Sequence, residues 1–386
     1  MKGDINCIQE TKLARTQLRD NHVHISNILS FFCFPNTKLG YSGVATFCQE
    51  DICPIAVYTG LDSVINILDD SFVMPDLEIS ISNLTSEGRC IVCLFQCIAG
   101  DHSFELLVFN VYVPCYSKDN DILRLQYKHD YLKLLSAVIK HCIKQKYSVI
   151  SVGDYNVAHS RIDHRCPEDV EDFDSNPSRI IFKDLVNNSK DGLYDVFRVF
   201  HNNVQNSFTC WNTKTGARQT NFGSRIDYIL CSNDLVTYAK ECCLLTEVTG
   251  SDHCPVFARF SGFTISKSTS IPESCSRFYP EFRVKQASLE NFIDIGVKRS
   301  ISTSHICSQG PSQKKKSQTS LQSFLSGNGL EKLADPPLCT GHNLPSLQRV
   351  VRKPGPNKGR HFWICSKPEG NKSDANARCD FFRWLR

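Results

Sequence analysis

The 386-residue sequence lacks the apolar runs that secretion and membrane insertion require. Its first residues, Met-Lys-Gly-Asp-Ile, contain no apolar core of signal-peptide length. No apolar stretch approaches the roughly 20 residues that span a bilayer. Repeats of solenoid period are absent as well. We therefore expect an intracellular protein without a membrane partner, acting as a monomer.

The sequence also lacks the compact cysteine pattern of a disulfide scaffold. It has 20 cysteines, but they are scattered through strand-like runs such as Cys90–Cys97. Small secreted domains place cysteines differently, because they need disulfides in place of a large core. Most of these cysteines are expected to be buried thiols in a reducing compartment.

Charge is unevenly distributed along the chain. Residues 336–386 contain ten Lys/Arg and three Asp/Glu, and residues 263–335 contain ten and six. Since the whole chain carries +4, residues 1–262 carry −7. The basic C-terminal segment indicates binding to a polyanion. The acidic domain before it indicates that carboxylates are used there to hold metal ions.

Hydrophobic patterning divides the chain into three parts. Residues 1–262 alternate short apolar runs with helical segments, which predicts an α/β domain. Residues 263–335 are rich in Ser, Thr, Gln and Lys and are expected to be a disordered linker. Residues 336–386 form a compact Cys/His segment. The expected strands are 43–48, 106–113, 147–152, 225–231 and 255–260, and the expected amphipathic helix is 121–144. Because several strand runs are apolar at successive positions, their sheets should be covered on both faces.

Five short motifs place polar groups where expected strands of the first part end. Each motif alone matches an ordinary turn or a solvated histidine. Their occurrence together and in this order indicates a catalytic site instead. The motifs are Gln9–Lys12, Asn110–Pro114, Gly153–Asn156, Arg225–Tyr228 and Ser251–Pro255.

The residue types in these motifs suit hydrolysis of a phosphodiester. Carboxylates such as Glu10 and Asp252 suit Mg²⁺ or Mn²⁺. Asp154 and Asn156, two residues apart, can take a proton from water and orient it. Protonated His253, held by Asp227, can face the phosphate, and Tyr112 offers a phenol to the same anion. The expected catalytic residues are Tyr112, Asp154, Asn156, Asp227 and His253, and the expected metal site comprises Glu10, Asp154, Asn156, Asp252 and His253.

The segments Asp154–His159, Ile162–His164 and Thr220–Tyr228 resemble the apurinic/apyrimidinic endonuclease branch of the exonuclease–endonuclease–phosphatase superfamily, and its second eukaryotic type more than its first. The resemblance implies a four-layer α/β sandwich. It also implies that Glu10 and Asp252 bind metal, that Asp154 is the base beside Asn156, and that Asp227, His253 and Tyr112 face the phosphate.

The sequence departs from this family at two places. The family begins with a strand carrying a Trp-Asn-x-Asn-Gly-type motif, whereas this sequence starts near Asp4 of the strand expected to come second. Cys115 also follows Val113-Pro114 where relatives often have a polar residue. We therefore expect a sandwich that lacks its first strand.

The linker contains a peptide of the pattern Q-x-x-L-x-x-F at residues 318–325, behind three lysines. A single helical turn would place its Leu and Phe on one face. It resembles the peptide by which replication proteins bind the sliding clamp, and a similar pattern at 286–293 ranks second. A chance pattern in Gln/Ser-rich sequence is the alternative. The expected clamp contacts are Gln318, Leu321, Phe324 and Leu325.

The last segment carries a Cys₃His set, Cys339, His342, Cys365 and Cys379. So short and polar a segment needs a metal to fold, and Zn²⁺ takes four such ligands. Gly359-Arg360-His361-Phe362 resembles the signature of GRF zinc fingers. Cations for phosphates and aromatic faces for bases suit single-stranded DNA. The expected DNA contacts are Arg349, Arg352, Lys353, Lys358, Arg360 and Trp363.

The sequence thus predicts a nuclear DNA-repair nuclease of base excision repair, with mitochondrial targeting left open. We expect 3′–5′ exonuclease and 3′-phosphodiesterase activity, and weaker cleavage at abasic sites. The expected partners are DNA with abasic sites, 3′ ends or single-stranded regions, and the sliding clamp. One alternative is a catalytically inactive protein that binds DNA and the clamp. Another is an enzyme of the same fold acting on phospholipids or inositol phosphates, against which the basic zinc tail argues.

Overall fold

The computed structural model describes residues 3–36, 38–116, 121–170, 172–268, 270–283, 336–353, 355–371 and 373–385. They form two compact units. The first comprises the residues up to Arg283 together with Lys367–Arg378, and the second comprises the remaining C-terminal residues. Both candidate clamp peptides, 286–293 and 318–325, lie outside the described residues.

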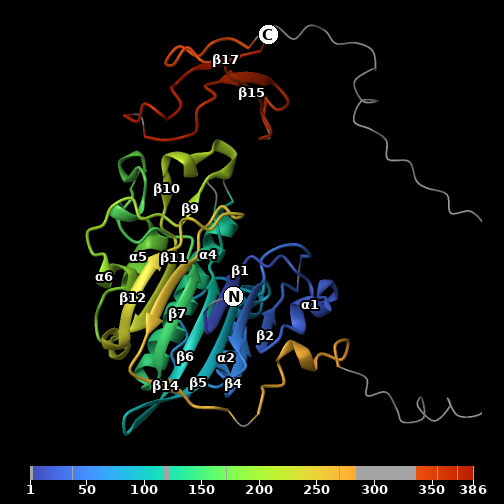
Figure 1. Ribbon diagram of the computed structural model, residues 1–386, viewed down its shortest axis with the longest axis vertical. Helices are drawn as coiled ribbons and strands as arrows, with labels where there is room; N and C mark the ends of the chain where they lie inside the picture. The colour runs from blue at the N-terminus through green and yellow to red at the C-terminus, as the bar shows by residue number, and fades with distance from the viewer. Residues whose placement is uncertain are drawn as a thin grey trace, which may run out of the picture. The chain divides into compact units, whose positions relative to one another are not determined.

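A seven-stranded mixed sheet forms the centre of the first unit (Figure 1). Its order is β14–β5–β6–β7–β11–β8, and β4 also pairs with β5. β6 and β7 run parallel, whereas the other neighbours run antiparallel. The strands are β4 (Ala56–Thr59), β5 (Cys90–Ala99), β6 (His102–Tyr112), β7 (Ser148–Asp154), β8 (Leu193–Asp195), β11 (Asp227–Ser232) and β14 (Thr264–Ile265).

Two smaller antiparallel sheets cover one face of this central sheet. One has the order β1–β3–β2 and the other pairs β12 with β13. Their apolar side chains share a core with the central sheet in which, for example, Phe31 packs with Val108 and Ile150. The strands are β1 (Ile5–Gln9), β2 (Ile28–Cys33), β3 (Val44–Gln49), β12 (Ala239–Leu244) and β13 (Val256–Phe260).

Helices cover the two outer faces. Leu135 and Val138 of the long helix α4 (Ile122–Lys144) pack in one core with Phe109 and Val149 of the central sheet. On the far side, a separate cluster joins α1 to the outer face of β2 and β3. Helices, sheet, sheet and helices give the predicted four-layer α/β sandwich. The other helices are α1 (Asp20–Val23), α2 (Leu61–Ile65), α3 (Ile81–Thr85), α5 (Pro177–Leu185) and α6 (Val196–Phe200), and two short strands, β9 (Cys210–Trp211) and β10 (Gly223–Ser224), form a ribbon.

The sequence patterns explain the central elements. β7 is buried on both faces along most of its length, as its continuous apolar run predicted. The helix expected at 121–144 is confirmed, with Asp121 as its N-cap accepting a hydrogen bond from the Arg124 amide at 2.9 Å. Among the described residues no cysteine forms a disulfide, and most of these cysteines are buried, as predicted. No described helix is both long enough and apolar enough to cross a membrane.

The first unit extends beyond the boundary expected at residue 262. β14 pairs with β5, Cys275 is buried, and the hydroxyls of Ser276 and Ser30 lie 2.5 Å apart. The expected boundary is therefore too early, since the fold continues to Arg283. The Ser/Thr-rich composition concealed this segment, because it packs onto an existing core and needs only a few apolar anchors, such as Phe278.

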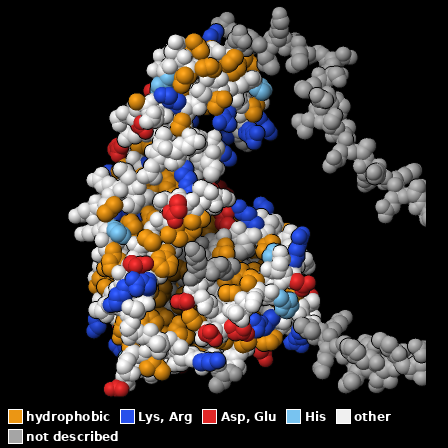
Figure 2. Space-filling view, viewed as in Figure 1, with side chains coloured by type: hydrophobic (Ala, Val, Ile, Leu, Met, Phe, Trp, Pro, Cys, Tyr) orange, Lys and Arg blue, Asp and Glu red, His pale blue; other side chains and the backbone are white. Residues whose placement is uncertain are grey.

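The two smaller sheets leave open edges over the central sheet. Among the described strands, β1 pairs only with β3, and β13 pairs only with β12. Val152 of β7 and Ile229 of β11 are only half-buried, although both belong to interior strands. Figure 2 shows hydrophobic side chains gathered on this face of the first unit.

The second unit contains an antiparallel sheet of β15 (Leu347–Val350), β16 (His361–Ile364) and β17 (Phe382–Trp384). Phe362, Phe382 and Trp384 form an aromatic cluster on it, with ring centroids 5.1–5.8 Å apart. Phe382 remains 52% exposed. Such a sheet cannot bury enough apolar surface to stabilise itself, which is why the cysteines and the histidine beside it matter.

Candidate functional site

Three neighbouring strands of the central sheet bring polar side chains together at one end. Tyr112 ends β6, Asp154 ends β7, and Asp227 begins β11. Asp154 stands in register with Tyr112 on one side and with Asp227 on the other. Adjacent strands lie about 4.8 Å apart, so these side chains share one small volume. The structure thus brings together three of the residues predicted from separate motifs.

Asp154 and Asn156 form a tightly bonded pair. The Asn156 amide donates to Oδ1 of Asp154 at 2.8 Å, and Nδ2 donates to Oδ2 at 2.9 Å. Nδ2 also donates to the Val113 carbonyl at 2.9 Å. Asn156 adopts a left-handed backbone conformation with φ of 52°, which Asn tolerates better than most residues. Asn156 therefore fixes both carboxylate oxygens of Asp154.

The electrostatic surroundings favour a proton on Asp154. Burial raises the pKa of Asp154, the negative charge of Asp227 raises it further, and His253 opposes both effects. Asp154 is only 5% exposed. A carboxylate whose pKa lies above its usual range is suited to accept a proton near neutral pH.

Asp227 holds the imidazole of His253. His253 Nδ1 lies 2.8 Å from Oδ2 and 3.1 Å from Oδ1 of Asp227. Burial alone would lower the pKa of His253, but the hydrogen bond and charge of Asp227, with a contact from Cys210, raise it to about 12. The ring is therefore cationic over the whole neutral range, which suits it to face a phosphate.

Glu10 follows β1 and contacts two of its neighbours. The Tyr112 hydroxyl donates to Oε1 of Glu10, and Lys12 forms an ion pair with Oε2 at 2.8 Å. Burial would raise the pKa of Glu10, but the hydrogen bonds from Lys12 and Tyr112 lower it overall. Burial, followed by the bond to Glu10, raises the pKa of Tyr112, so the phenol stays protonated. Glu10 is thus an ionised oxygen donor beside the other site residues.

The donor set at this end of the sheet fits a hard divalent cation. Ligand atoms of Asp154, Asp227 and His253 lie within 4.8 Å of one another, and Glu10 adds a carboxylate next to Tyr112. Because the cationic ring of His253 cannot bind a metal ion, the carboxylates are the donors, and His253 does not serve as the expected metal ligand. Oxygen donors of this kind suit Mg²⁺ or Mn²⁺. Asp252, an expected ligand, is exposed and lies outside that close group, although its backbone oxygen accepts from Trp211 at 2.9 Å.

Two supporting residues were not assigned roles from the sequence. Asn110 is fully buried, accepts from Gln9 Nε2 at 2.7 Å and donates to the Ala45 carbonyl at 2.9 Å, which fixes β1 beside Glu10. Lys128 of α4 donates to the Asn156 carbonyl at 2.8 Å. Asn110 lies within the Asn110–Pro114 motif, so its place in the sequence could have indicated a role in the site. Lys128 gave no such indication, because a lysine in an amphipathic helix normally lies on the solvated face.

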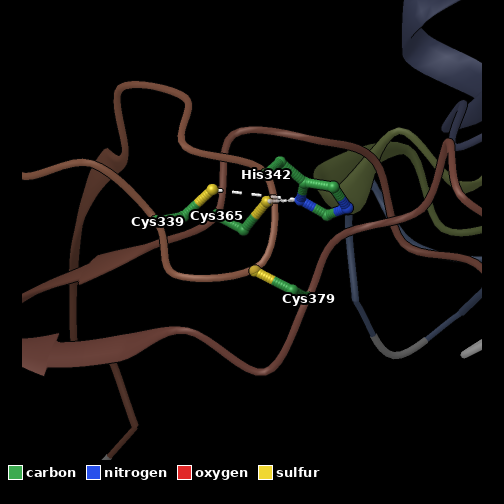
Figure 3. Close-up of side chains that lie close together, drawn as sticks. All are labelled: Cys339, His342, Cys365 and Cys379. Atoms are coloured by element: carbon green, nitrogen blue, oxygen red, sulfur yellow. Dashed lines mark hydrogen bonds between the residues drawn. The ribbon is translucent and has the colours of Figure 1, made fainter.

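The four predicted zinc ligands converge in the second unit (Figure 3). One ligand atom from each lies within 4.8 Å of the others, and His342 Nδ1 lies 3.4 Å from Cys365 Sγ and 3.9 Å from Cys339 Sγ. Burial would raise the pKa of Cys339, but hydrogen bonds from the Leu344 and His342 backbone lower it, which favours the thiolate that binds metal. This donor set fits tetrahedral Zn²⁺.

The expected DNA contacts are spread over both faces of the second unit's sheet. Arg349 stands opposite Phe362, which stands opposite Trp384, whereas Trp363 is paired with Gln348 and Arg383. Because side chains alternate along a strand, Trp363 projects from the other face. Arg360 lies over the Trp384 ring at 4.1 Å. Arg352, Lys353 and Lys358 are exposed in the loop between β15 and β16.

Comparisons with known proteins agree with this geometry. The Endonuclease/Exonuclease/phosphatase family profile matches residues 2–253, and the GRF zinc finger profile matches residues 337–386. DNA-(apurinic or apyrimidinic site) endonuclease 2 of Xenopus laevis is 30% identical, over 100% of this chain and 94% of the relative. The Homo sapiens protein of the same name is 29% identical, over 100% and 92%.

Solved structures show the same fold. The catalytic domain of Xenopus laevis APE2 superposes with a TM-score of 0.66 at 35% identity, covering 74% of this chain and 91% of that one. An AP endonuclease from Leishmania major, at 22% identity and a TM-score of 0.53, covers 67% and 78% and shares the fold. The chain therefore belongs to the endonuclease/exonuclease/phosphatase family of metal-dependent enzymes, in its AP endonuclease 2 branch of DNA-repair nucleases, with a zinc-binding GRF finger.

Proposed function

We propose that this chain hydrolyses DNA phosphodiesters with Mg²⁺ or Mn²⁺, as a 3′–5′ exonuclease and 3′-phosphodiesterase with weaker cleavage at abasic sites. One observation carries the proposal: Asp154, Asn156, Asp227, His253, Tyr112 and Glu10 meet at one end of the central sheet in mutually bonded pairs. That arrangement holds a general base, a cation for the phosphate and an oxygen-donor site together.

Each residue of the site has a separate task in the proposed reaction. Asp154 takes the proton of the attacking water, and Asn156 keeps both oxygens of that carboxylate in position. His253, protonated and held by Asp227, faces the negative charge that develops on the phosphate. The Tyr112 hydroxyl is set next to Glu10 and toward the same anion. A cation held by Glu10 with Asp154 or Asp252 would supply further positive charge against the phosphate.

In addition to this hydrolysis by the first unit, the zinc finger would bind single-stranded DNA. Its exposed Arg and Lys side chains suit phosphates, and its aromatic cluster offers faces for stacking bases. We place the single-stranded DNA on the face of the sheet that carries Arg349 and Trp384. Arg360, which lies over the Trp384 ring, stands at the edge of this face. Trp363, on the other face, would contact DNA only if the strand wraps around the sheet.

The linker peptide at residues 318–325 would recruit the enzyme to the sliding clamp, as a monomer acting in the nucleus. This part of the proposal rests on the sequence pattern alone. A peptide carrying residues 314–328 should bind the clamp, and replacing Leu321 and Phe324 by alanine should abolish binding. Equal binding by both peptides would contradict the assignment.

The test of the catalytic proposal is digestion of a recessed 3′ end in Mg²⁺, with Asp154→Asn as the variant and Asp191→Asn, exposed on the far loop, as the control. The wild type and the control should release nucleotides from the 3′ end, and Asp154→Asn should lose activity by about 10³-fold or more. Parallel assays on abasic duplex DNA, RNA and phosphoinositides set the substrate class. Cleavage confined to phosphoinositides would overturn the proposal.

A further inference from the structure

A buried lysine reaches the turn that carries the catalytic pair. Lys128 lies on α4 and is 6% exposed, and its Nζ donates to the Asn156 backbone oxygen at 2.8 Å. Among the described residues its ammonium group forms no ion pair with a carboxylate. Its positive charge therefore has a backbone carbonyl as its hydrogen-bond partner.

Packing alone does not account for this side chain. A buried ammonium is costly unless it is paired, so an apolar residue would serve better at a position that only fills the core. The protein thus maintains an unfavourable buried cation close to the catalytic carboxylate.

The contact acts on the conformation of Asn156. With φ at 52°, this residue occupies a narrow left-handed region in which its amide and side chain both bond Asp154. A charged donor on the Asn156 carbonyl fixes the orientation of the following peptide plane, and charge-assisted hydrogen bonds are roughly twice as strong as neutral ones. Loss of that donor would let the turn relax and release the Asp154 oxygens.

We propose that Lys128 is a positioning residue for phosphodiester hydrolysis. Its hydrogen bond to the Asn156 carbonyl holds the Asn156 turn in place and thereby keeps the Asp154 carboxylate aligned. The inference rests on the proposed nuclease function. Lys128 does not itself contact substrate in this role. Its effect passes through the Asn156 carbonyl, the Asn156 amide and the Asp154 carboxylate in turn.

The test compares Lys128→Met, Lys128→Arg and Lys144→Met, in the full chain. Lys144 is exposed on the same helix, so its replacement removes one positive charge without touching the site. Three quantities are measured: kcat and KM for 3′-end digestion, and the hydrogen-exchange rate of the Asn156 amide by NMR. The melting temperature of each variant monitors folding.

We expect Lys128→Met to lower kcat by about 10- to 100-fold with KM little changed, as outer residues that orient a site do. Asn156 exchange should accelerate, Lys128→Arg should recover most of the loss, and Lys144→Met should match the wild type. An unchanged kcat and exchange rate in Lys128→Met would overturn the inference. Equal losses of kcat in Lys128→Met and Lys128→Arg, together with a lowered melting temperature, would also overturn it. That result would indicate that Lys128 contributes only to packing. If the wild type cleaves no DNA, the nuclease proposal fails, while the exchange rates still decide whether Lys128 holds the turn.

Discussion

Nδ1 of His253 lies 2.8 Å from Oδ2 of Asp227, on the strand next to the one that carries Asp154. This pairing sets the charge of the imidazole, since Asp227 raises the pKa of His253 against its burial. The proton on His253 therefore depends on a neighbour that need not touch the substrate.

Replacing Asp227 by asparagine should move the basic limb of the pH–rate profile. In the wild type His253 remains protonated until the pH approaches about 12. Its charge should therefore cause no loss of rate between about pH 7 and 10. Without the carboxylate the pKa falls, so the Asp227→Asn rate should drop by about tenfold or more over that range. Steady-state rates against pH are the measurement, with His253→Gln as the reference that lacks this limb. Parallel profiles for the wild type and Asp227→Asn would refute the assignment.

Gly153 should tolerate no side chain. It precedes Asp154 in β7 with φ of 135°, and an added Cβ would lie 1.9 Å from the Val111 carbonyl oxygen of the paired strand. Strain and the clash together should cost about 3 kcal/mol or more. Chemical denaturation measures the loss. Gly250→Ala is the matched control, because it has φ of 106° but open space around it. Similar losses in both variants would show that the close approach to Val111 is unimportant.

The sequence identified the site residues that stand at or near strand ends. Asp154 ends β7 and Asp227 begins β11, and the fold brings them together because these strands are neighbours, whereas His253 comes from the loop before β13. Periodicity also predicted α4 and the covered faces of the central sheet. These features depend on local patterns, which a sequence displays directly.

Other features depend on tertiary contacts that no local pattern encodes. Lys128 looks like any charged residue of an amphipathic helix until α4 is packed against the Asn156 turn. Residues 263–283 look like a linker until Phe278 and Cys275 are placed on the core. Trp363 looks like a stacking residue from the sequence, yet the register of β16 and β17 places it on the face opposite to Phe362 and Trp384. In each case the role of the residue depends on which elements of the fold pack against each other.

Gly341→Ala should abolish zinc binding by the finger. A Cβ at Gly341 would lie 2.5 Å from the Cys379 Cβ and 2.8 Å from its sulfur, so one ligand would be pushed away. The second unit has little core and should unfold without its metal. Zinc content per chain should fall from about one to near zero, and EDTA should produce the same unfolding in the wild type. Thr340→Ala, an exposed neighbour, serves as the control. A zinc-loaded Gly341→Ala finger would contradict the ligand set.

His164 should make the first unit less stable in mild acid. Burial, with Arg165 and Arg179 nearby, lowers the pKa of His164 from 6.5 to about 4, and its Nδ1 accepts from the Cys166 amide at 3.2 Å. The folded chain thus holds the ring neutral where the unfolded chain protonates it. This contribution is fully present above pH 6.5 and is lost as the pH falls toward 4. His164→Asn should show a shallower decline of unfolding free energy across that window, measured against urea. Identical slopes of unfolding free energy against pH for the wild type and His164→Asn would mean that protonation of His164 does not lower the stability of the folded chain.

The face assignment on the finger predicts which residues determine binding of single-stranded DNA. Arg349 and Arg360 lie with Phe362 and Trp384, whereas Trp363 projects from the opposite face. Each arginine that contacts a phosphate releases counterions, so its replacement by alanine should reduce the salt dependence of binding by about 0.7 in log–log slope. Trp384→Leu should weaken binding by about 1–3 kcal/mol through lost stacking. Trp363→Leu should change the affinity for oligo(dT) little, provided that zinc content shows an intact finger. A larger loss for Trp363→Leu than for Trp384→Leu would place the strand on the other face of the sheet, because the two residues share a fold and differ in the side from which they project.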